Sequence, residues 1–162
     1  MQDFFMNCAT VLQKYGFSYL RGAGTTLLLA LVGTFFGCLI GFAVGALQTI
    51  PIDKQRDPAW KRVLLKILHI FLRCYVELFR GTPMIVQAVF IYYGLLQVFG
   101  IKMGMWQAGF FIVSINTGAY MAETVRGGIV SIDPGQTEGA KAIGMNHWQT
   151  MLHVILPQAL RN

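Results

Sequence analysis

Charged residues are scarce in this sequence, and their scarcity argues against an ordinary water-soluble domain. Asp, Glu, Lys and Arg make up 12% of the 162 residues, whereas hydrophobic residues make up 55%. Soluble domains carry about 25% charged residues. So few ionised side chains form too small a polar shell for a domain of this length. We therefore expect an all-α chain integrated in a lipid bilayer.

Several features of enzymes are also missing. The cysteines and histidines do not have a spacing typical of metal ligands, and no Ser, Cys or His is paired with a carboxylate as a nucleophile would be. We therefore predict no catalytic residues and no metal site. The phosphate-binding pattern Gly-x-x-x-x-Gly-Lys-Ser/Thr does not occur in the sequence either. ATP hydrolysis is consequently not expected on this chain.

A cleavable signal peptide is not expected. The first 22 residues contain Asp3 and Lys14 and lack a compact apolar centre. They are interpreted as an external amino-terminal segment, and residues 23–162 as one transmembrane domain.

The first predicted transmembrane helix covers about residues 23–48. No charged residue occurs from Thr25 to Leu47, and at ~1.5 Å per residue this stretch is long enough for a ~30 Å hydrocarbon layer. Glycine recurs there at every fourth position, which places four glycines on one helix face where a second backbone can approach closely. This predicted helix-packing face consists of Gly33, Gly37, Gly41 and Gly45.

Positive charges cluster in the connecting stretch after this helix, in which two prolines also lie. Clustered Lys and Arg beside apolar segments are typical of a cytoplasmic loop, which would place the amino terminus outside. The net charge of +6 is also typical of proteins that bind nucleic acid. No folded basic surface is available for such binding, so no nucleic-acid partner is predicted. The cluster consists of Lys54, Arg56, Lys61, Arg62 and Lys66.

Two further crossings are predicted, at about 63–99 and 105–128. Gly81-Thr82-Pro83 interrupts the first of them, because proline lacks an amide donor and restricts the residue before it. If 63–79 and 84–99 crossed separately, the tail of the chain would lie outside. If they form one interrupted crossing, the tail would lie inside. Hydropathy alone does not choose between these alternatives.

The tail from Ser131 predicts two short helices. Asp133-Pro134-Gly135 is a turn followed by a helix start, and Gly144 can end that helix in the left-handed conformation. A second helix is expected over 145–156, stopped by Pro157. The apolar residues expected at the exposed edge of this pair are Met145, Trp148 and Met151.

At these residues the sequence resembles the EAA motif of binding-protein-dependent ABC transporter permeases. That motif reads Glu-Ala-Ala, three residues, Gly, nine residues, Ile, one residue, Leu-Pro. Gly139 and Val154 depart from it, and a glycine weakens a helix by about 1 kcal/mol relative to alanine. With every spacing kept, the motif falls on Glu138, Gly139, Ala140, Gly144, Val154, Leu156 and Pro157.

Two more stretches, Val76–Pro83 and Ala119–Ile129, resemble the polar amino-acid (His, Glu, Gln or Arg) branch of the same family. The resemblance extends over about 20–162 and implies the type I ABC importer permease fold, with the EAA segment in the cytoplasm. An internal tail would make 63–99 a single interrupted crossing. The chain would then contain three crossings and the cytoplasmic coupling segment 131–157, and would lack the last two transmembrane helices of the family core.

The resemblance implies a transport subunit rather than an enzyme. The chain would be the permease subunit of an ATP-driven ABC importer for amino acids, with polar ones as substrates, in the bacterial cytoplasmic (inner) membrane. Its partners would be ABC ATPase subunits, an extracellular or periplasmic solute-binding protein, and a second permease subunit in a homo- or heterodimer. ATP and Mg would be bound by the ATPase, and no cofactor by this chain. As a carboxy-terminally truncated fragment, it is not expected to transport alone.

Charged residues beside the apolar segments have two interpretations. Glu77 and Arg80, like Glu123 and Arg126, are three residues apart and can pair on one helix face. Such pairs can hold a helix end at the headgroup boundary. Alternatively, Arg80 or Glu123 faces the central cavity and meets a zwitterionic substrate.

Polar residues within the last apolar run have the same two interpretations. Ser114, Asn116 and Thr117 either line a pathway or form hydrogen bonds between helices. The candidate substrate-pathway residues are Arg80, Asn116, Glu123 and Arg126.

Two rival functions belong to other classes. A membrane-embedded enzyme would use the charged pairs as acid and base, but no nucleophile accompanies them. A non-transporting membrane scaffold would use the tail to bind a cytosolic partner that is not an ATPase. Co-purification discriminates between this function and import, because it identifies the partner.

Overall fold

The structure, a computed structural model, describes residues 2–53 and 58–161. Lys54 and Arg56 of the predicted basic loop lie outside these residues. Within the described ranges every element of secondary structure is helical. The elements are α1 (Gln2–Gln48), α2 (Ala59–Gly81), α3 (Met84–Phe99), α4 (Met105–Val130), α5 (Pro134–Ala142), α6 (His147–Thr150), the π-helix η1 (Met151–Ile155) and α7 (Leu156–Ala159).

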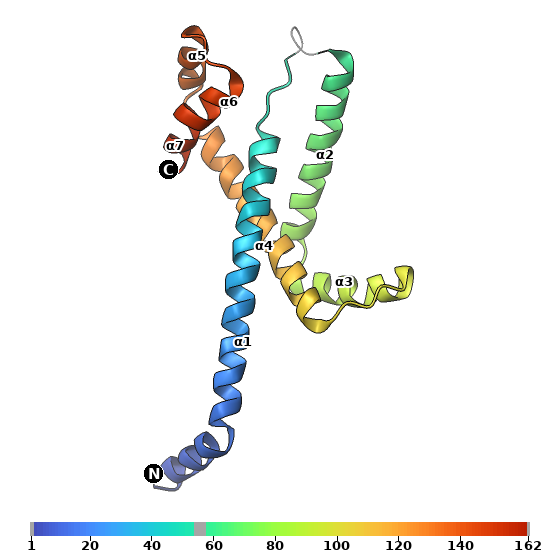
Figure 1. Cartoon of the computed structure of the whole chain (residues 1–162), viewed down its shortest axis with the longest axis vertical. Helices are drawn as coiled ribbons and strands as arrows, with labels where there is room; N and C mark the ends of the chain where they lie inside the picture. The colour runs from blue at the N-terminus through green and yellow to red at the C-terminus, as the bar shows by residue number, and fades with distance from the viewer. Residues whose placement is uncertain (1, 54–57, 162) are drawn as a thin grey trace.

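Helix α1 is a single long helix that contains the uncharged stretch from Thr25 to Leu47. It begins at Gln2, so the amino-terminal segment continues the same helix, and Figure 1 shows its first turns bent away from the straight part. Thr10–Gln48 is the one described helix that is long and apolar enough to cross a bilayer without another.

The glycine face of α1 packs against α4. A Cβ atom added to Gly37 would lie 2.6 Å from Cβ of Thr117, and one added to Gly45 would lie 2.7 Å from the carbonyl oxygen of Ala122. Cβ atoms essentially never approach other atoms so closely, and the other two glycines of the face meet α4 in the same way. The missing side chains let the two backbones touch, so α4 is the close neighbour of this glycine face.

Helices α2 and α3 meet at a sharp bend of 113°. α2 ends at Gly81, Thr82 is extended with φ −117° and ψ 145°, and Pro83 precedes α3. Proline pushes the residue before it out of the helical region, which accounts for the break. Only taken together do the two helices meet the length and hydropathy criteria for a membrane span. That 63–99 crosses the membrane once stays a prediction.

Helix α4 lies at the centre of the molecule. Ala119 and Ala122 on it are completely buried, and Ile112 and Ile129 nearly so. Its length is sufficient, but its hydropathy falls below the criterion that α1 meets. Because α1, α2 and α3 all pack against α4, it presents less surface to lipid and tolerates polar residues at its contacts with them.

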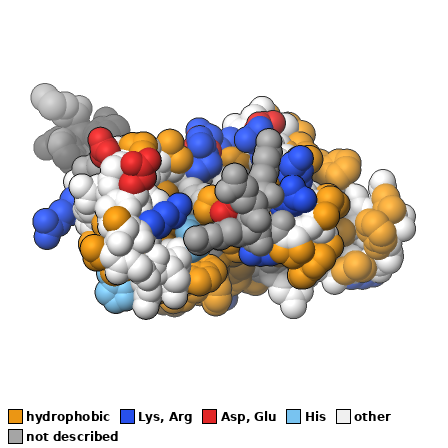
Figure 2. Space-filling model, turned by 90° about the horizontal axis from the view of Figure 1, so that it is seen from above, with side chains coloured by type: hydrophobic (Ala, Val, Ile, Leu, Met, Phe, Trp, Pro, Cys, Tyr) orange, Lys and Arg blue, Asp and Glu red, His pale blue; other side chains and the backbone are white. Residues whose placement is uncertain are grey.

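The direction of the long helices places two distant parts of the sequence at one end. Figure 1 shows α1 and α4 running toward the end where α5, α6 and α7 lie, α2 running back from it, and α3 lying across the molecule away from it. Figure 2 looks onto this end and shows Lys and Arg side chains gathered there. The flanks of the basic loop and the coupling segment therefore share one end of the molecule.

Candidate functional site

The coupling segment begins with a helix start encoded by three residues. Oδ1 of Asp133 accepts a hydrogen bond of 2.6 Å from the amide of Gly135, and Pro134 occupies the first helical position, where its missing amide costs nothing. α5 ends before Gly144, whose φ of +85° is left-handed, as its glycine predicts. The amide of Met145 then donates to the carbonyl of Ala140 at 3.0 Å, which closes the turn.

The second helix of the segment differs from the prediction at its end. Asn146 and Gln149 cap α6 reciprocally, with both hydrogen bonds 2.9 Å long. Pro157 does not stop the helix, because the chain widens into the π-helix η1 and then continues as α7 to Ala159. The amide of Leu156 donates to the carbonyl of Met151, five residues back. This wider turn accommodates the proline ring, which a regular α-turn would clash with.

One face of the segment docks on the carboxyl end of α4. Met151 and Ile155 are buried against Ile129 of α4. Gly128 allows the close approach of Ala159, whose carbonyl oxygen would lie 3.2 Å from an added Cβ. The prediction that Met151 is exposed is therefore wrong. The widened turn brings Met151 and Ile155 to the same face, where Ile129 of α4 offers them an apolar partner.

The opposite face of the segment leaves large apolar side chains exposed. Ile143 is 79% exposed and Trp148 60% exposed. The sequence predicts that Trp148 is exposed, but it does not single out Ile143, which looks like an ordinary apolar residue at the end of a helix. Its position directly before Gly144, where the helix must end, is the feature that could have indicated its exposure. Exposed apolar groups on an ordered segment are typical of a contact with another protein.

The residues of the EAA motif divide between these two faces. Ala140 is buried, and Val154 and Leu156 are packed against the cluster around Ile129. Glu138, Gly139, Gly144 and Pro157 are exposed. Part of the motif thus holds the segment on α4, and the other part is available for a partner.

His147 lies where the segment meets the rest of the chain. Burial lowers the pKa of its imidazole below the usual value, and the positive charge of Lys141 lowers the pKa further. Both residues also line a cavity of about 180 Å³ behind the segment, with Thr49 from the end of α1. A proton on His147 is therefore bound more weakly in the folded chain than in the unfolded one.

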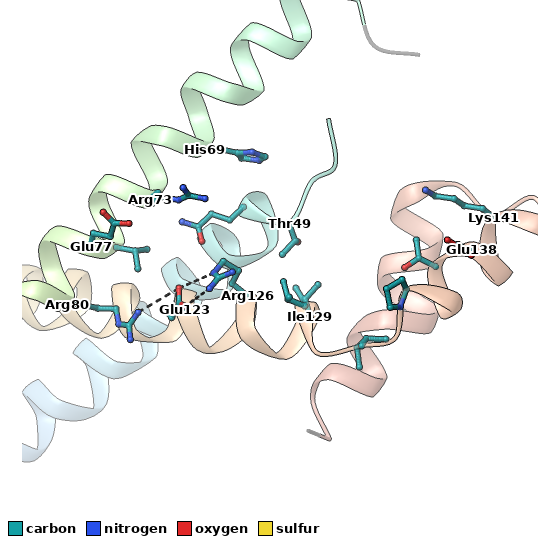
Figure 3. Close-up of a pocket in the computed structure, with 16 residues that line it drawn as sticks. Thr49, His69, Arg73, Glu77, Arg80, Glu123, Arg126, Ile129, Glu138 and Lys141 are labelled. Atoms are coloured by element: carbon teal, nitrogen blue, oxygen red, sulfur yellow. Dashed lines mark hydrogen bonds and ion pairs between the residues drawn. The ribbon is translucent and has the colours of Figure 1, made fainter. Parts of the chain in front are cut away.

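A charged cleft of about 710 Å³ lies between the coupling segment and the long helices. Figure 3 shows its lining residues contributed by α2, α4, α5 and the end of α1. Among the described residues no group of three His, Cys, Asp or Glu side chains could hold a metal ion. Its charged lining residues are Arg73, Glu77, Arg80, Glu123, Arg126, Glu138 and Lys141.

Glu123 is the centre of charge in this cleft. Arg126 donates two hydrogen bonds to it, from Nη2 to Oε1 at 2.6 Å and from Nε to Oε2 at 3.0 Å. Nη1 of Arg80, on α2, lies 3.8 Å from Oε2 of the same carboxylate. The structure therefore pairs Arg80 of α2 with Glu123 of α4. Of the two pairs predicted from the sequence, Glu123–Arg126 forms, whereas Glu77–Arg80 is not among the ion pairs of the described residues. Figure 3 shows this arrangement.

Asn116 is not part of the cleft. Its amide nitrogen donates to Oε1 of Gln87 at 2.9 Å and to the carbonyl of Phe79 at 3.2 Å, so it connects α4 to both α2 and α3. Thr117 packs on Gly37 of α1. These polar residues make contacts between helices, and a pathway role for Asn116 stays a prediction.

Known proteins resemble this chain in sequence and in structure. Residues 59–162 match the family described as binding-protein-dependent transport system inner membrane component. The glutamine transport system permease protein GlnP of Escherichia coli is 34% identical over 88% of this chain. The chain belongs to this permease family.

Solved structures give the fold. An amino acid ABC transporter crystallised with histidines superposes with a TM-score of 0.76 at 34% identity, over 94% of this chain and 64% of that one. An inward-facing methionine ABC transporter, MetNI, superposes with a TM-score of 0.69 at 26% identity, over 91% of this chain and 65% of that one. The fold is that of type I ABC importer permeases. The chain spans about three fifths of the length of the curated relatives it matches.

Proposed function

We propose that this chain is the membrane-spanning permease subunit of an ATP-driven importer of amino acids, with polar amino acids as substrates. One observation carries the proposal: the EAA segment is folded as a compact unit on the end of α4, beside a charged cleft. Membership of the permease family and the likeness to a glutamine permease support the same function and the substrate class.

The coupling segment transmits the energy of ATP hydrolysis. Ile143 and Trp148 on its outward face contact an ATPase subunit, which binds ATP and Mg, and no cofactor is bound by this chain. Closure of the ATPase pair moves the segment, and the buried contacts of Met151 and Ile155 with Ile129 pass that movement to α4. A rigid, well-packed contact transmits displacement better than a solvated one does.

The other partners and the location follow from the same function. A second permease subunit completes the translocation pathway, and an extracellular or periplasmic solute-binding protein delivers the substrate. The chain lies in the bacterial cytoplasmic membrane with its amino terminus outside. The shared end of the basic loop's flanks and the coupling segment supports this orientation, because both belong on the cytoplasmic side.

The charged cleft provides the part of the pathway next to the ATPase. Glu123 attracts an ammonium group, and Arg80 and Arg126 attract a carboxylate, so the cluster is complementary to a zwitterion. In the competing role, the ion pair between Arg80 and Glu123, 3.8 Å apart, only holds α2 on α4. The substitution of Glu123 considered in the Discussion distinguishes the two roles.

Co-purification tests the function. The tagged chain, expressed with candidate ATPase and binding-protein subunits, is extracted in mild detergent and returned to lipid. The expected result is recovery of an ATPase whose hydrolysis rises when substrate-loaded binding protein is added. Recovery of a partner that is not an ATPase would favour the alternative, a non-transporting membrane scaffold, and would overturn the proposal.

A further inference from the structure

The bend between α2 and α3 creates a hydrogen-bonding problem at the end of α2. In a continuing α-helix the amide of residue 83 would donate to the carbonyl of Phe79, four residues back. Residue 83 is a proline and has no amide hydrogen. The carbonyl oxygen of Phe79 therefore needs another donor, because an unpaired carbonyl in apolar surroundings is costly.

Two side chains from other helices supply the missing donors. Nε2 of Gln87, on α3, lies 2.9 Å from the carbonyl oxygen of Phe79. The same nitrogen lies 2.9 Å from the carbonyl oxygen of Thr82 and 2.8 Å from its hydroxyl. Nδ2 of Asn116, on α4, donates to Phe79 at 3.2 Å and to Oε1 of Gln87 at 2.9 Å. Three helices thus meet at one carbonyl group.

The surroundings of Gln87 indicate that these bonds are not incidental. Gln87 is only 7% exposed and is the one buried residue of α3. Its two hydrogens and its oxygen all have partners, whereas Gln97, on the same helix, is exposed. A buried amide that is fully hydrogen-bonded holds its neighbours in one arrangement, and the same amide without partners would be destabilising.

We propose that Gln87 and Asn116 are positioning residues that form a clasp with Phe79 and Thr82. The clasp fixes the bend between α2 and α3 and fastens both helices to α4. Without the clasp, no helical hydrogen bonds would connect α2 and α3 through Thr82 and Pro83, and the angle between the two helices could change.

The position of the clasp on α4 connects it to the coupling segment. Asn116 and Ile129 are both on α4, about 20 Å apart at ~1.5 Å per residue, and the coupling segment is packed on Ile129. In the importer proposed above, on which this step rests, α4 acts as a rigid rod. Movement of the segment displaces the clasp, and α3 moves with α4 instead of staying with the lipid.

The bend itself is tested by distance measurement. Spin labels are attached at Phe71 on α2 and Val98 on α3, both exposed, in a cysteine-free background of the full chain in lipid nanodiscs. Electron–electron resonance should give one narrow distance distribution. Gln87→Leu and Asn116→Leu should each broaden it, whereas the matched control Gln97→Leu should leave it narrow. A narrow distribution in both clasp variants would overturn the proposal.

A rescue experiment covers the case in which the variants do not fold. Gln87→Leu/Asn116→Leu leaves the Phe79 carbonyl without a donor, and Pro83→Ala supplies one by letting α2 extend through residue 83. The triple variant should therefore regain the yield and the helical circular dichroism that the double variant loses. A triple variant no better than the double one would overturn the clasp. Neither measurement needs transport, so a chain that passes both and never imports an amino acid contradicts the proposed function alone.

Discussion

At the scale of single residues, Glu123 has a larger role than its spacing from Arg126 predicts. It accepts two hydrogen bonds from Arg126 and forms an ion pair with Arg80, which lies on another helix. The guanidinium of Arg80 also lies 5.7 Å from the centre of the Tyr120 ring, which adds to its attraction to α4. One carboxylate therefore neutralises charge from two helices at the cleft.

Glu123→Gln is expected to impair transport while leaving assembly and ATPase docking intact. Glutamine keeps the shape but loses the charge, and a hydrogen bond to a charged group contributes about 1.5 kcal/mol, so uptake should fall roughly tenfold. The measurement is substrate uptake in cells that also produce the partner subunits, normalised to the amount of chain in the membrane. Glu77→Gln, in the same cleft, is the control and should change uptake less. Wild-type uptake by Glu123→Gln would show that the ion pairs only hold the helices together.

The histidine in the coupling segment predicts a dependence on pH. Because the pKa of His147 in the docked segment is below its usual value of 6.5, the neutral form favours docking. The unfolded chain binds a proton at His147 more readily, so this contribution to the stability of the fold is fully present above pH 6.5 and falls as the pH is lowered below that value. The melting temperature of the chain should fall more on acidification than that of His147→Asn. His153→Asn, an exposed histidine of the same segment, is the control, and equal pH profiles for all three proteins would contradict the prediction.

At the scale of elements, the contact between α1 and α4 depends on glycines that leave room for backbone. The face was predicted from the spacing of the four glycines, but the identity of the partner was not. A Cβ added at Gly41 would lie 2.7 Å from the carbonyl oxygen of Gly118 and 2.8 Å from the amide nitrogen of Ala122. Both neighbours are backbone atoms, which cannot turn aside as a side chain can.

Gly41→Ala should therefore destabilise the chain, by about 1–3 kcal/mol, as overpacking of a close contact does. Gly24→Ala on the same helix is the control, because nothing lies within 4 Å of a Cβ added there. Alanine favours helix by about 1 kcal/mol over glycine, so this control should be neutral or stabilising. Thermal unfolding in detergent, followed by circular dichroism, measures both. Equal effects of the two substitutions would mean that α1 does not pack on α4 through this face.

The coupling segment shows that glycine and proline do not predict helix ends equally well. Pro157 predicts a helix end, yet the chain remains helical to Ala159 because η1 widens the turn before it. The prediction of a left-handed Gly144 is confirmed by its φ of +85°, since that conformation is a property of one residue. Whether a proline ends a helix depends on its surroundings, because packing partners can stabilise a wider turn next to it.

At the scale of the whole molecule, the arrangement of the helices bears on the orientation in the membrane. α1, α2 and α4 run in alternating directions and α3 lies across the molecule (Figure 1). That the chain makes three crossings, with the coupling segment and the flanks of the basic loop on the same side, stays a prediction with which these directions are compatible. The bend of 113° at Pro83 turns α3 out of the direction of α2.

Cysteine labelling tests this orientation. In a background without the native cysteines, Lys102→Cys lies in the connection between α3 and α4, and Ala142→Cys at the end of α5. A membrane-impermeant maleimide added to intact cells should label residue 102 and should label residue 142 only after the membrane is opened. Labelling of residue 142 in intact cells would place the coupling segment outside and contradict both the orientation and the docking of an ATPase.

Local chemistry determined much of this protein from the sequence alone. The lack of charge, the four-residue glycine repeat, the capped start at Asp133 and the spacing from Glu138 to Pro157 are all visible in the chain. Each depends on residues that are close in the sequence, and together they led to the family and the fold class.

Only the tertiary structure decided which distant groups meet. It joined Arg80 to Glu123 rather than to Glu77, buried Met151 against Ile129, and used Asn116 with Gln87 to complete the broken end of α2. The physical reason is the same in each case. A charge, an apolar side chain or an unpaired carbonyl requires a partner, but the sequence does not reveal which of several partners lies within reach until the helices have packed.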